Sequence, residues 1–333
     1  MSRLIEPHGG ELVDLIVGEE QAEELKNQSK EWPSWDLSPR QMCDIELLLN
    51  GAFSPLRGFM KREDYDSVCS TMRLADSTVW PIPITLAVSE EFASSLSSGD
   101  KVALRDPEGV MLAVLNVEDV WQADKKAEAA GVYGTEDTFH KGVAYLLNDT
   151  PDWYIGGEVQ GVQLPFHYDS RSLRLSPKGI RREFERFGWR NVIAFQTRNP
   201  MHRSHEFLAK IAVQVCDGVL IHQVLGALKP GDIPANVRVA SIDKLVENYF
   251  APGTAIQAGY PIEMRYAGPR EALLHALFRQ NFGCSHLVVG RDHAGVGDYY
   301  GPFDAHDIFD ELDTGSLEPQ PLKIDITFFC HQC

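Results

Sequence analysis

Residues 191–226 read NVIAFQTRNPMHRSHEFLAKIAVQVCDGVLIHQVLG, and this stretch decides the fold class. Its apolar run 191–196 predicts a buried strand, and the apolar run 218–226 predicts another. Residues 203–216, which lie between them, predict an amphipathic helix. The apolar face of that helix would carry Phe207, Leu208, Ile211, Ala212 and Val215. A strand, a helix and a strand of these lengths indicate a βαβ unit in a parallel sheet.

The same alternation continues towards the C-terminus. Two more strands are predicted over 255–260 and 285–290, and two more helices over 237–250 and 268–283, the latter closed by a glycine. In such a sheet, ligands bind beyond the carboxyl ends of the strands. Functional residues are therefore expected in the loops that follow Gln196, Gly226, Tyr260 and Gly290.

The first half of the chain has a different pattern. Short apolar runs, rich in β-branched residues and broken by Pro, Gly and Asp, predict a small β-rich domain. These runs are 79–88, 101–106 and 110–121, accompanied by helices predicted over 38–51 and around 124–130. Gly, Pro and polar residues accumulate between Gly156 and Ser176. We therefore expect one domain over residues 1–165 and a second over residues 166–333.

The composition excludes several classes of function. The 333 residues carry 31 Lys and Arg against 48 Asp and Glu, a formal net charge of −17 at pH 7. Nucleic acids and anionic membranes would repel such a chain, so neither is expected as a partner. No apolar run is long enough to span a membrane, and the N-terminus has no signal-peptide core, which predicts a cytoplasmic protein. The six cysteines are then expected to be reduced thiols.

One segment departs from this acidity and leads into the first strand-end loop. Residues 165–210 contain ten Lys and Arg but four Asp and Glu, a local net charge of +6. The loop itself, 196–206, reads QTRNPMHRSHE. His202 and His205 are three residues apart, so both rings should project to one side of a helical turn. Arg198, Arg203 and the helix N-terminus add positive potential there, which suits phosphate or sulfate oxygens.

A second loop, 290–297, reads GRDHAGVG. Its three glycines let backbone N–H groups approach an anion closely, and Arg291 can bind a tetrahedral oxyanion through two hydrogen bonds. The chain has no Walker phosphate loop, no Gly-x-Gly-x-x-Gly and no Gly-x-Ser-x-Gly nucleophile elbow. The two loops therefore offer cations and hydrogen-bond donors but no activated nucleophile. Such groups are suited to stabilising charge during phosphoryl or nucleotidyl transfer.

Two other functions remain open at this stage. His202 and His205 could be two ligands of a zinc hydrolase, although catalytic zinc needs a third ligand and a general base, and no His-Glu-x-x-His occurs. The N-terminal half could be an RNA-binding module, although it lacks a basic aromatic stripe.

The residues of both loops resemble those of the ATP sulfurylase, or sulfate adenylyltransferase, family. The matching patterns are QTRNPxHxxHE at 196–206 and GRDHAG at 290–295, with further similarity over 43–60, 229–238 and 264–301. The resemblance implies a PUA-like pseudobarrel domain followed by a Rossmann-like nucleotidyltransferase domain. It also implies the reaction of MgATP with sulfate, giving adenosine 5′-phosphosulfate (APS) and pyrophosphate by direct in-line attack on the α-phosphorus.

The resemblance also implies roles for individual residues. Catalysis would involve Thr197, Arg198, Asn199, His202 and His205. Sulfate would be bound by Gln196, Arg198, Arg291 and the backbone N–H of Ala294. ATP would be bound by Gln196, Thr197, Arg198, Asn199, His202, His205, Gly290, Arg291, Asp292, His293 and Phe328.

The family further implies a homo-oligomer that uses Mg²⁺ as MgATP. Relatives continue after a Cys-x-x-Cys pair with a further Cys and a His that resemble a zinc site, whereas this sequence stops at Cys330 and Cys333. Two thiolates are half of a tetrahedral zinc site, so a zinc site would need a longer form of the chain. Some relatives carry a fused adenylylsulfate kinase domain, and the sequence leaves open both this domain and the zinc site.

Overall fold

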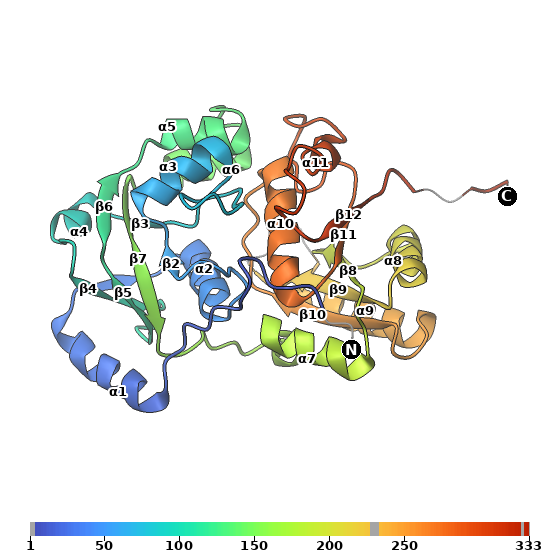
Figure 1. The fold of residues 1–333 in the computed structure, drawn as a ribbon, viewed down its shortest axis with the longest axis horizontal. Helices are drawn as coiled ribbons and strands as arrows, with labels where there is room; N and C mark the ends of the chain where they lie inside the picture. Colours follow the sequence, from blue (N-terminus) through green and yellow to red (C-terminus); the bar gives the residue numbers. More distant parts are fainter. Residues whose placement is uncertain (1–3, 227–232, 328–329, 333) are drawn as a thin grey trace.

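The computed structural model describes residues 4–226, 233–327 and 330–332. These residues form two halves that lie side by side, the N-terminal half in blue to green and the C-terminal half in yellow-green to red (Figure 1). Each half has its own sheet. None of the helices within the described ranges has the length and apolar character needed to cross a membrane.

The N-terminal half is built on a mostly antiparallel sheet, which confirms the β-rich prediction. Its strands are β1 (Ser34–Asp36), β2 (Gly58–Phe59), β3 (Leu86–Val88), β4 (Lys101–Arg105), β5 (Met111–Asn116), β6 (Asp119–Gln122) and β7 (Trp153–Gly161). The order is β1-β4-β5-β7-β2, with β3 and β6 also paired to β7. The helices are α1 (Glu19–Gln28), α2 (Pro39–Leu49), α3 (Arg62–Thr71), α4 (Glu90–Ser94), α5 (Lys125–Glu128) and α6 (Lys141–Ala144).

Two predicted apolar runs divide differently in the structure. The run 79–88 forms a strand only from Leu86 onward, because Pro81 and Pro83 have no backbone N–H to give to a sheet. The run 110–121 becomes two strands, β5 and β6, that both pair with β7. The predicted boundary window of 156–176 also begins inside β7, which continues to Gly161.

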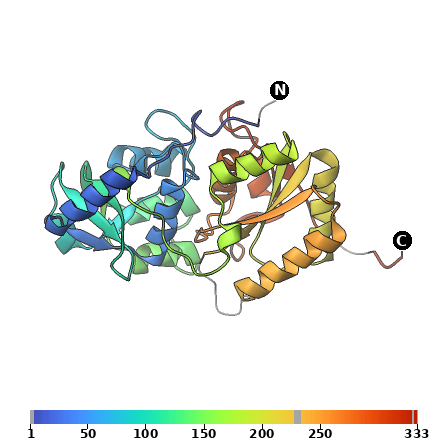
Figure 2. The same cartoon turned by 90° about the horizontal axis from the view of Figure 1, so that it is seen from below.

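The C-terminal half has a five-stranded, fully parallel sheet, as the βαβ pattern predicts. Its strands are β8 (Val192–Thr197), β9 (Gly218–Val224), β10 (Ala255–Tyr260), β11 (His286–Val289) and β12 (Gln320–Lys323). Its helices are α7 (Pro177–Phe187), α8 (Arg203–Val215), α9 (Ala235–Tyr249), α10 (Pro269–Phe282) and α11 (Asp304–Asp307). The pattern analysis did not predict β12, α7 or α11. Figure 2 shows this sheet with helices on both sides.

The strand order β10-β9-β8-β11-β12 places a topological switch point between β8 and β11. The chain leaves β8 towards β9 on one side, and it returns to β11 on the other. Ile193 and Ala194 of β8 pair with His286 and Leu287 of β11. The two loops that follow these neighbouring strands therefore begin at the same edge of the sheet, which is where open α/β sheets bind ligands.

The predicted core face of α8 is partly wrong. Phe207 and Val215 are 57% and 61% exposed, whereas Ala209 and Ala212 are fully buried in a cluster with Ile193 of β8. The helix has apolar residues on two adjoining stripes, and the stripe that carries the small alanines packs on the sheet. Because the small alanines let the helix lie close to the sheet, the larger Phe207 remains at the surface.

Helix α10 joins the two halves. All of residues 271–282 are buried, so this helix is enclosed on every side rather than amphipathic. Arg270 at its start donates to the carbonyls of Val68, Cys69 and Pro81, and Asn281 near its end donates to the carbonyls of Ala52 and Ser54. Both ends are thus tied to the backbone of the N-terminal half, and one cluster of buried apolar side chains runs through both halves.

Candidate active site

The loop after β8 begins with a tight turn. The Thr197 hydroxyl accepts from the Asn199 N–H at 3.1 Å and donates to the Asn199 carbonyl at 2.7 Å. Thr197 is buried, whereas Asn199 is exposed. The hydroxyl therefore supports the turn from inside, and the Asn199 side chain is available at the surface.

Arg198 is held at both its backbone and its side chain. Its Nη1 donates to the Tyr266 hydroxyl at 3.0 Å, and its carbonyl accepts from Nη1 of the fully buried Arg238 at 2.6 Å. Arg238 comes from α9 and also donates to the carbonyl of Val224, where β9 ends. The guanidinium of Arg198 thus has a neutral partner, which leaves its positive charge available to an anion.

Gln196 has a buried amide with little protein bonding. Its Oε1 has no hydrogen-bond partner among the described residues, and its Nε2 has only the Met264 sulfur at 3.9 Å. A buried carbonyl oxygen without a donor costs free energy, and the weakly bonded Nε2 can donate to a ligand at this sheet edge.

His202 and His205 do project to one side, as their spacing predicts. Their rings stack with centroids 3.9 Å apart at the start of α8, and His205 Nδ1 accepts from the His202 N–H at 3.4 Å. Burial, and then the charge of His202, lower the pKa of His205. Stacked rings are not the convergent geometry of two zinc ligands.

The prediction that Arg203 adds positive potential to this loop is wrong. Its Nη1 pairs with Glu206 at 2.7 Å, and its guanidinium lies 4.8 Å from the Tyr249 ring of α9. Glu206 also binds Lys210 at 2.7 Å. Arg203 is thus engaged along the outer surface of α8 and α9.

The loop after β11 has an unusual backbone. Asp292 and Ala294 adopt φ of +51° and +58°, which non-glycine residues rarely do. The Asp292 N–H donates to the Pro302 carbonyl at 3.0 Å, and the Ala294 carbonyl accepts from the Gly268 N–H at 3.2 Å. The Ala294 N–H has no acceptor in the described parts of the chain, and Arg291 is exposed beside it.

A buried chain of polar side chains supports this second loop, and sequence analysis missed it. His293 Nε2 lies 3.0 Å from His275 Nδ1, and His275 Nε2 lies 3.5 Å from a Glu271 oxygen. Glu271 also accepts from the backbone N–H groups of Arg265 and Ala267, at 2.9 and 3.1 Å. The available signal was an acid and a histidine four residues apart within the helix predicted over 268–283.

The charges along this chain are set by burial and by its partners. Burial, with the nearby His275, lowers the pKa of His293 to about 3. Burial would raise the pKa of Glu271, but His275 and the Arg265 N–H outweigh it, so the pKa is lowered. Burial also lowers the pKa of His275, so a carboxylate lies next to two neutral imidazoles at neutral pH.

Two of the sequence-predicted residues, Phe328 and Cys333, lie outside the described residues. Cys330 is exposed. Within the described ranges, no three His, Cys, Asp or Glu side chains gather as a metal site.

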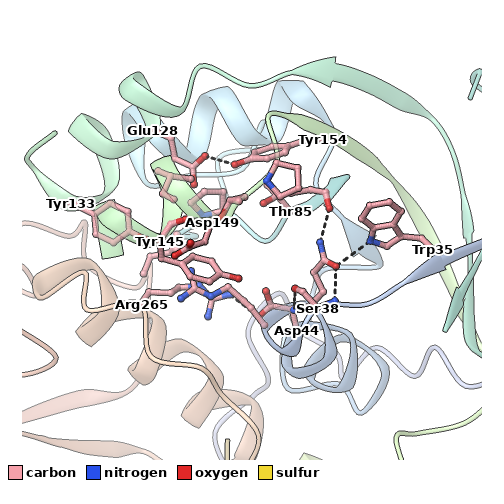
Figure 3. A pocket seen from close by; sticks show the side chains of 18 of the residues that line it. Trp35, Ser38, Asp44, Thr85, Glu128, Tyr133, Tyr145, Asp149, Tyr154 and Arg265 are labelled. Atoms are coloured by element: carbon pink, nitrogen blue, oxygen red, sulfur yellow. Dashed lines mark hydrogen bonds and ion pairs between the residues drawn. The ribbon is translucent and has the colours of Figure 1, made fainter. Parts of the chain in front are cut away.

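A cavity of about 270 Å³ lies near these loops but is separate from them. Its walls come mainly from the N-terminal half, including Trp35, Tyr145 and Tyr154, with Arg265 from the C-terminal half (Figure 3). No residue of 196–206 or 290–297 lines it. The predicted site is therefore the sheet edge and not this cavity.

Comparison with known proteins agrees with both halves of the fold. The model of the PUA-like domain family matches residues 5–164, and the ATP-sulfurylase family model matches residues 171–333. A solved structure described as a hexameric APS kinase from Thiobacillus denitrificans superimposes with a TM-score of 0.74 at 33% identity. That match covers 97% of this chain and 57% of the solved chain.

Curated relatives match over nearly the whole chain. A sulfate adenylyltransferase of Chlorobaculum tepidum is 53% identical over 99% of this chain and 82% of its own length. One from Thiobacillus denitrificans is 50% identical, with coverages of 100% and 83%, and one from Entamoeba histolytica is 47% identical, with 100% and 81%. The chain therefore belongs to the ATP sulfurylase, or sulfate adenylyltransferase, family.

Proposed function

We propose that this sulfate adenylyltransferase carries out its reaction at the edge where β8 and β11 end. A sulfate oxygen attacks the α-phosphorus of MgATP in line with the bond to the β-phosphate. One bond forms between a sulfate oxygen and the α-phosphorus, the bond between the α-phosphorus and the oxygen that bridges to the β-phosphorus breaks, and pyrophosphate leaves with the electron pair. No covalent enzyme intermediate is needed. The observation that carries the proposal is the meeting of the two cationic loops at the switch point.

The reaction requires two anions to come together, so the protein must align them and neutralise their charge. Sulfate is assigned to Arg198, which has no carboxylate partner among the described residues, and to Arg291, which is exposed on the facing loop. The Gln196 Nε2, whose protein partner is the Met264 sulfur at 3.9 Å, and the Ala294 N–H supply neutral donors for the same anion.

The phosphates of ATP are assigned to the start of α8. His202 and His205 stand at the helix N-terminus, where the backbone also favours negative charge. Thr197 holds the turn that presents Asn199 to the same phosphates. Together these residues stabilise the charge that grows on the leaving pyrophosphate.

The nucleotide is assigned to the second loop, along Gly290, Arg291, Asp292 and His293. The His293 ring is already hydrogen-bonded to His275, which fixes the path of this loop before ATP arrives. Mg²⁺ enters as part of the MgATP substrate.

The remaining assignments rest on the family and on the fold. We propose domains over 1–165 and 166–333, supported by the two family matches and by the separate sheets. A homo-oligomer is proposed because the solved relative is described as hexameric. We also propose a cytoplasmic location, and no nucleic-acid or membrane partner, since the net charge of −17 would repel both.

A pyrophosphate-release assay tests the proposal. ATP with sulfate should release pyrophosphate, and ATP alone should not. APS with pyrophosphate should yield ATP in the reverse direction. Absence of both products from the folded protein would overturn the assignment.

A further inference from the structure

The loop between β10 and α10, residues 261–268, lies between the two anion-binding loops and contacts both. Its Met264 approaches the Gln196 amide, and its Tyr266 hydroxyl accepts from Arg198. At its end, the Gly268 N–H donates to the Ala294 carbonyl. We call residues 261–268 the bridging loop. Its position makes it able to set the spacing of the sulfate-binding groups.

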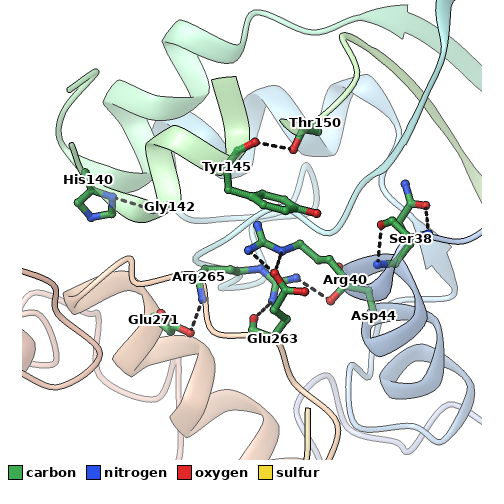
Figure 4. Close-up of polar contacts among 11 residues, drawn as sticks. Ser38, Arg40, Asp44, His140, Gly142, Tyr145, Thr150, Glu263, Arg265 and Glu271 are labelled. Carbon is green, nitrogen blue, oxygen red and sulfur yellow. Dashed lines mark hydrogen bonds and ion pairs between the residues drawn. The ribbon is translucent and has the colours of Figure 1, made fainter. Parts of the chain in front are cut away.

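The N-terminal half holds the bridging loop by two ion pairs of opposite polarity: helix α2 supplies the base of one pair and the acid of the other (Figure 4). Arg40 of α2 donates through Nε and Nη2 to one Glu263 oxygen, at 3.2 and 2.9 Å. One turn along α2, Asp44 accepts from Arg265 Nη2 at 2.6 Å, and each side chain of this second pair is 4% exposed. Each partner thus contributes one acid and one base, which fixes the register of α2 against the loop.

The Arg40 side chain is itself fixed. Its guanidinium lies 3.7 Å from the centre of the Tyr145 ring, which belongs to the N-terminal half. Both members of its pair with Glu263 are mostly buried, with side-chain exposures of 16% and 22%. Partial burial and a fixed guanidinium make this pair stronger than an exposed one.

Tyr266 sits in a backbone conformation that needs such support. Its φ is +62°, and Glu271 accepts from the N–H groups on either side of it, those of Arg265 and Ala267. The Tyr266 carbonyl accepts from the Tyr300 hydroxyl at 3.3 Å. A strained conformation of this kind persists only where the surroundings determine it. Here the result is a tyrosine hydroxyl aimed at Arg198.

We propose that the N-terminal half takes part in catalysis as a positioning element: α2 holds the bridging loop, and Tyr266 of that loop orients Arg198 towards sulfate. Arg40, Asp44, Glu263 and Tyr266 are then positioning residues of the reaction. The proposal rests on the assignment of Arg198 to sulfate. It gives the PUA-like half a role in turnover.

The test uses charge reversal of the less buried pair in the full chain. Arg40→Glu and Glu263→Arg should each lower kcat/KM for sulfate about tenfold, because misaligned catalytic groups lose rate steeply. The combined Arg40→Glu/Glu263→Arg variant should recover most of that loss. Arg57→Glu, which breaks the exposed Arg57–Glu11 pair in the same half, is the matched control and should behave as wild type. Arg40→Lys, which keeps the charge but not the two-pronged contact, is the milder variant if reversal prevents folding.

A second variant tests the route through Tyr266. Tyr266→Phe alone should also lower kcat/KM for sulfate about tenfold, because Arg198 loses its partner. In the Tyr266→Phe background, Arg40→Glu should then have less than about a twofold further effect, since the two act in one chain. The proposal would be overturned if Arg40→Glu still lowered kcat/KM about tenfold in the Tyr266→Phe background. It would also be overturned if the single variants had wild-type kinetics. Neither result would affect the proposed function of the wild-type protein.

Hydrogen–deuterium exchange gives a readout that does not depend on turnover. Arg40→Glu and Tyr266→Phe should speed amide exchange in residues 196–206, and Arg57→Glu should not. Unchanged exchange in this segment would overturn the positioning role, whatever the activity of the wild-type protein. A failure of the wild-type protein to release pyrophosphate would instead remove the proposed function.

Discussion

The loops 196–206 and 290–297 end neighbouring strands and face the same edge, yet they are held in opposite ways. The first presents groups with few protein partners: the Gln196 amide, the Arg198 charge and the stacked His202 and His205. The second is fixed from behind by His275 and Glu271.

This difference separates two tasks. The 196–206 loop has unfilled hydrogen-bonding and charge capacity, so the ligands complete it. In the 290–297 loop the Asp292 N–H, the Ala294 carbonyl and the His293 ring already have protein partners, so the loop offers a preformed surface on which the Ala294 N–H stays open to a ligand. Substitutions in the first loop should therefore remove ligand contacts directly, whereas substitutions behind the second should act through structure.

The largest effect is expected for Arg198→Ala. Removing one donor that stabilises transition-state charge typically costs about 10²–10³ in rate, and Arg198 is proposed to bind sulfate, the attacking anion. APS formation should nearly cease while the thermal unfolding midpoint stays close to wild type. Pyrophosphate release and a melting curve measure the two quantities. A folded Arg198→Ala protein with normal turnover would remove Arg198 from the site.

A smaller effect on rate, with a clear effect on stability, is expected for Glu271→Gln. The amide NH₂ cannot accept, so one of the N–H groups of Arg265 and Ala267 loses its buried partner. An unsatisfied buried donor costs about 1–3 kcal/mol of unfolding free energy. The rate should fall about tenfold, because the 290–297 loop, which Glu271 supports through His275, would shift. Urea unfolding checks the first value, and the exposed Glu247→Gln is the control. Full stability in Glu271→Gln would contradict the support role.

The sequence was informative wherever local pattern decides structure. The repeated alternation of strand and helix predicted β8 to β11 and their connecting helices, and the rule for parallel sheets then pointed to the loops after Gln196 and Gly290. The closing glycine of α10 was also identified correctly, since Gly283 adopts φ of +89°. These features depend on residues close together in the chain.

The missed features depend on contacts between distant residues. Strand β12 carries Pro321 in a four-residue edge strand, so it has no strong apolar pattern. Tyr266 and Arg198 are 68 residues apart, and Arg265 and Asp44 are 221 apart. Nothing in the local sequence shows that these side chains meet, because their meeting depends on strand order and on how α10 joins the two halves.

The titration of His205 and of His293 should differ in the same way as the two loops that carry them. Burial and the neighbouring His202 lower the pKa of His205, and bound pyrophosphate should raise that pKa because an anion stabilises the imidazolium. A pKa that rises on binding means that the protonated form binds more tightly. Pyrophosphate affinity should therefore fall as pH rises through the pKa of the complex.

His293, with a pKa of about 3, should not titrate between about pH 5 and 8, with or without pyrophosphate. Two-dimensional NMR of labelled imidazoles measures both residues in one sample. If the pKa of His205 did not change when pyrophosphate binds, and His293 titrated near neutral pH, the assignment would be reversed. The 290–297 loop would then be the adaptable one and the 196–206 loop the preformed one.

The smallest effect is expected for Arg203→Ala, and it is informative because Arg203 lies within the matched motif. Its charge is engaged by Glu206 and lies against Tyr249, on the surface formed by α8 and α9. Arg203 is the exposed member of this pair, at 75% side-chain exposure, and the buried Glu206 keeps Lys210 as a partner, so the rate should change by less than about twofold. The comparison with Arg198→Ala, measured in one pyrophosphate-release series, separates an arginine that faces the anions from one in the first turn of α8 that pairs with Glu206. A loss above about tenfold would show that Arg203 turns towards the phosphates when ATP binds, and the 196–206 loop would then be more adaptable than its free structure indicates.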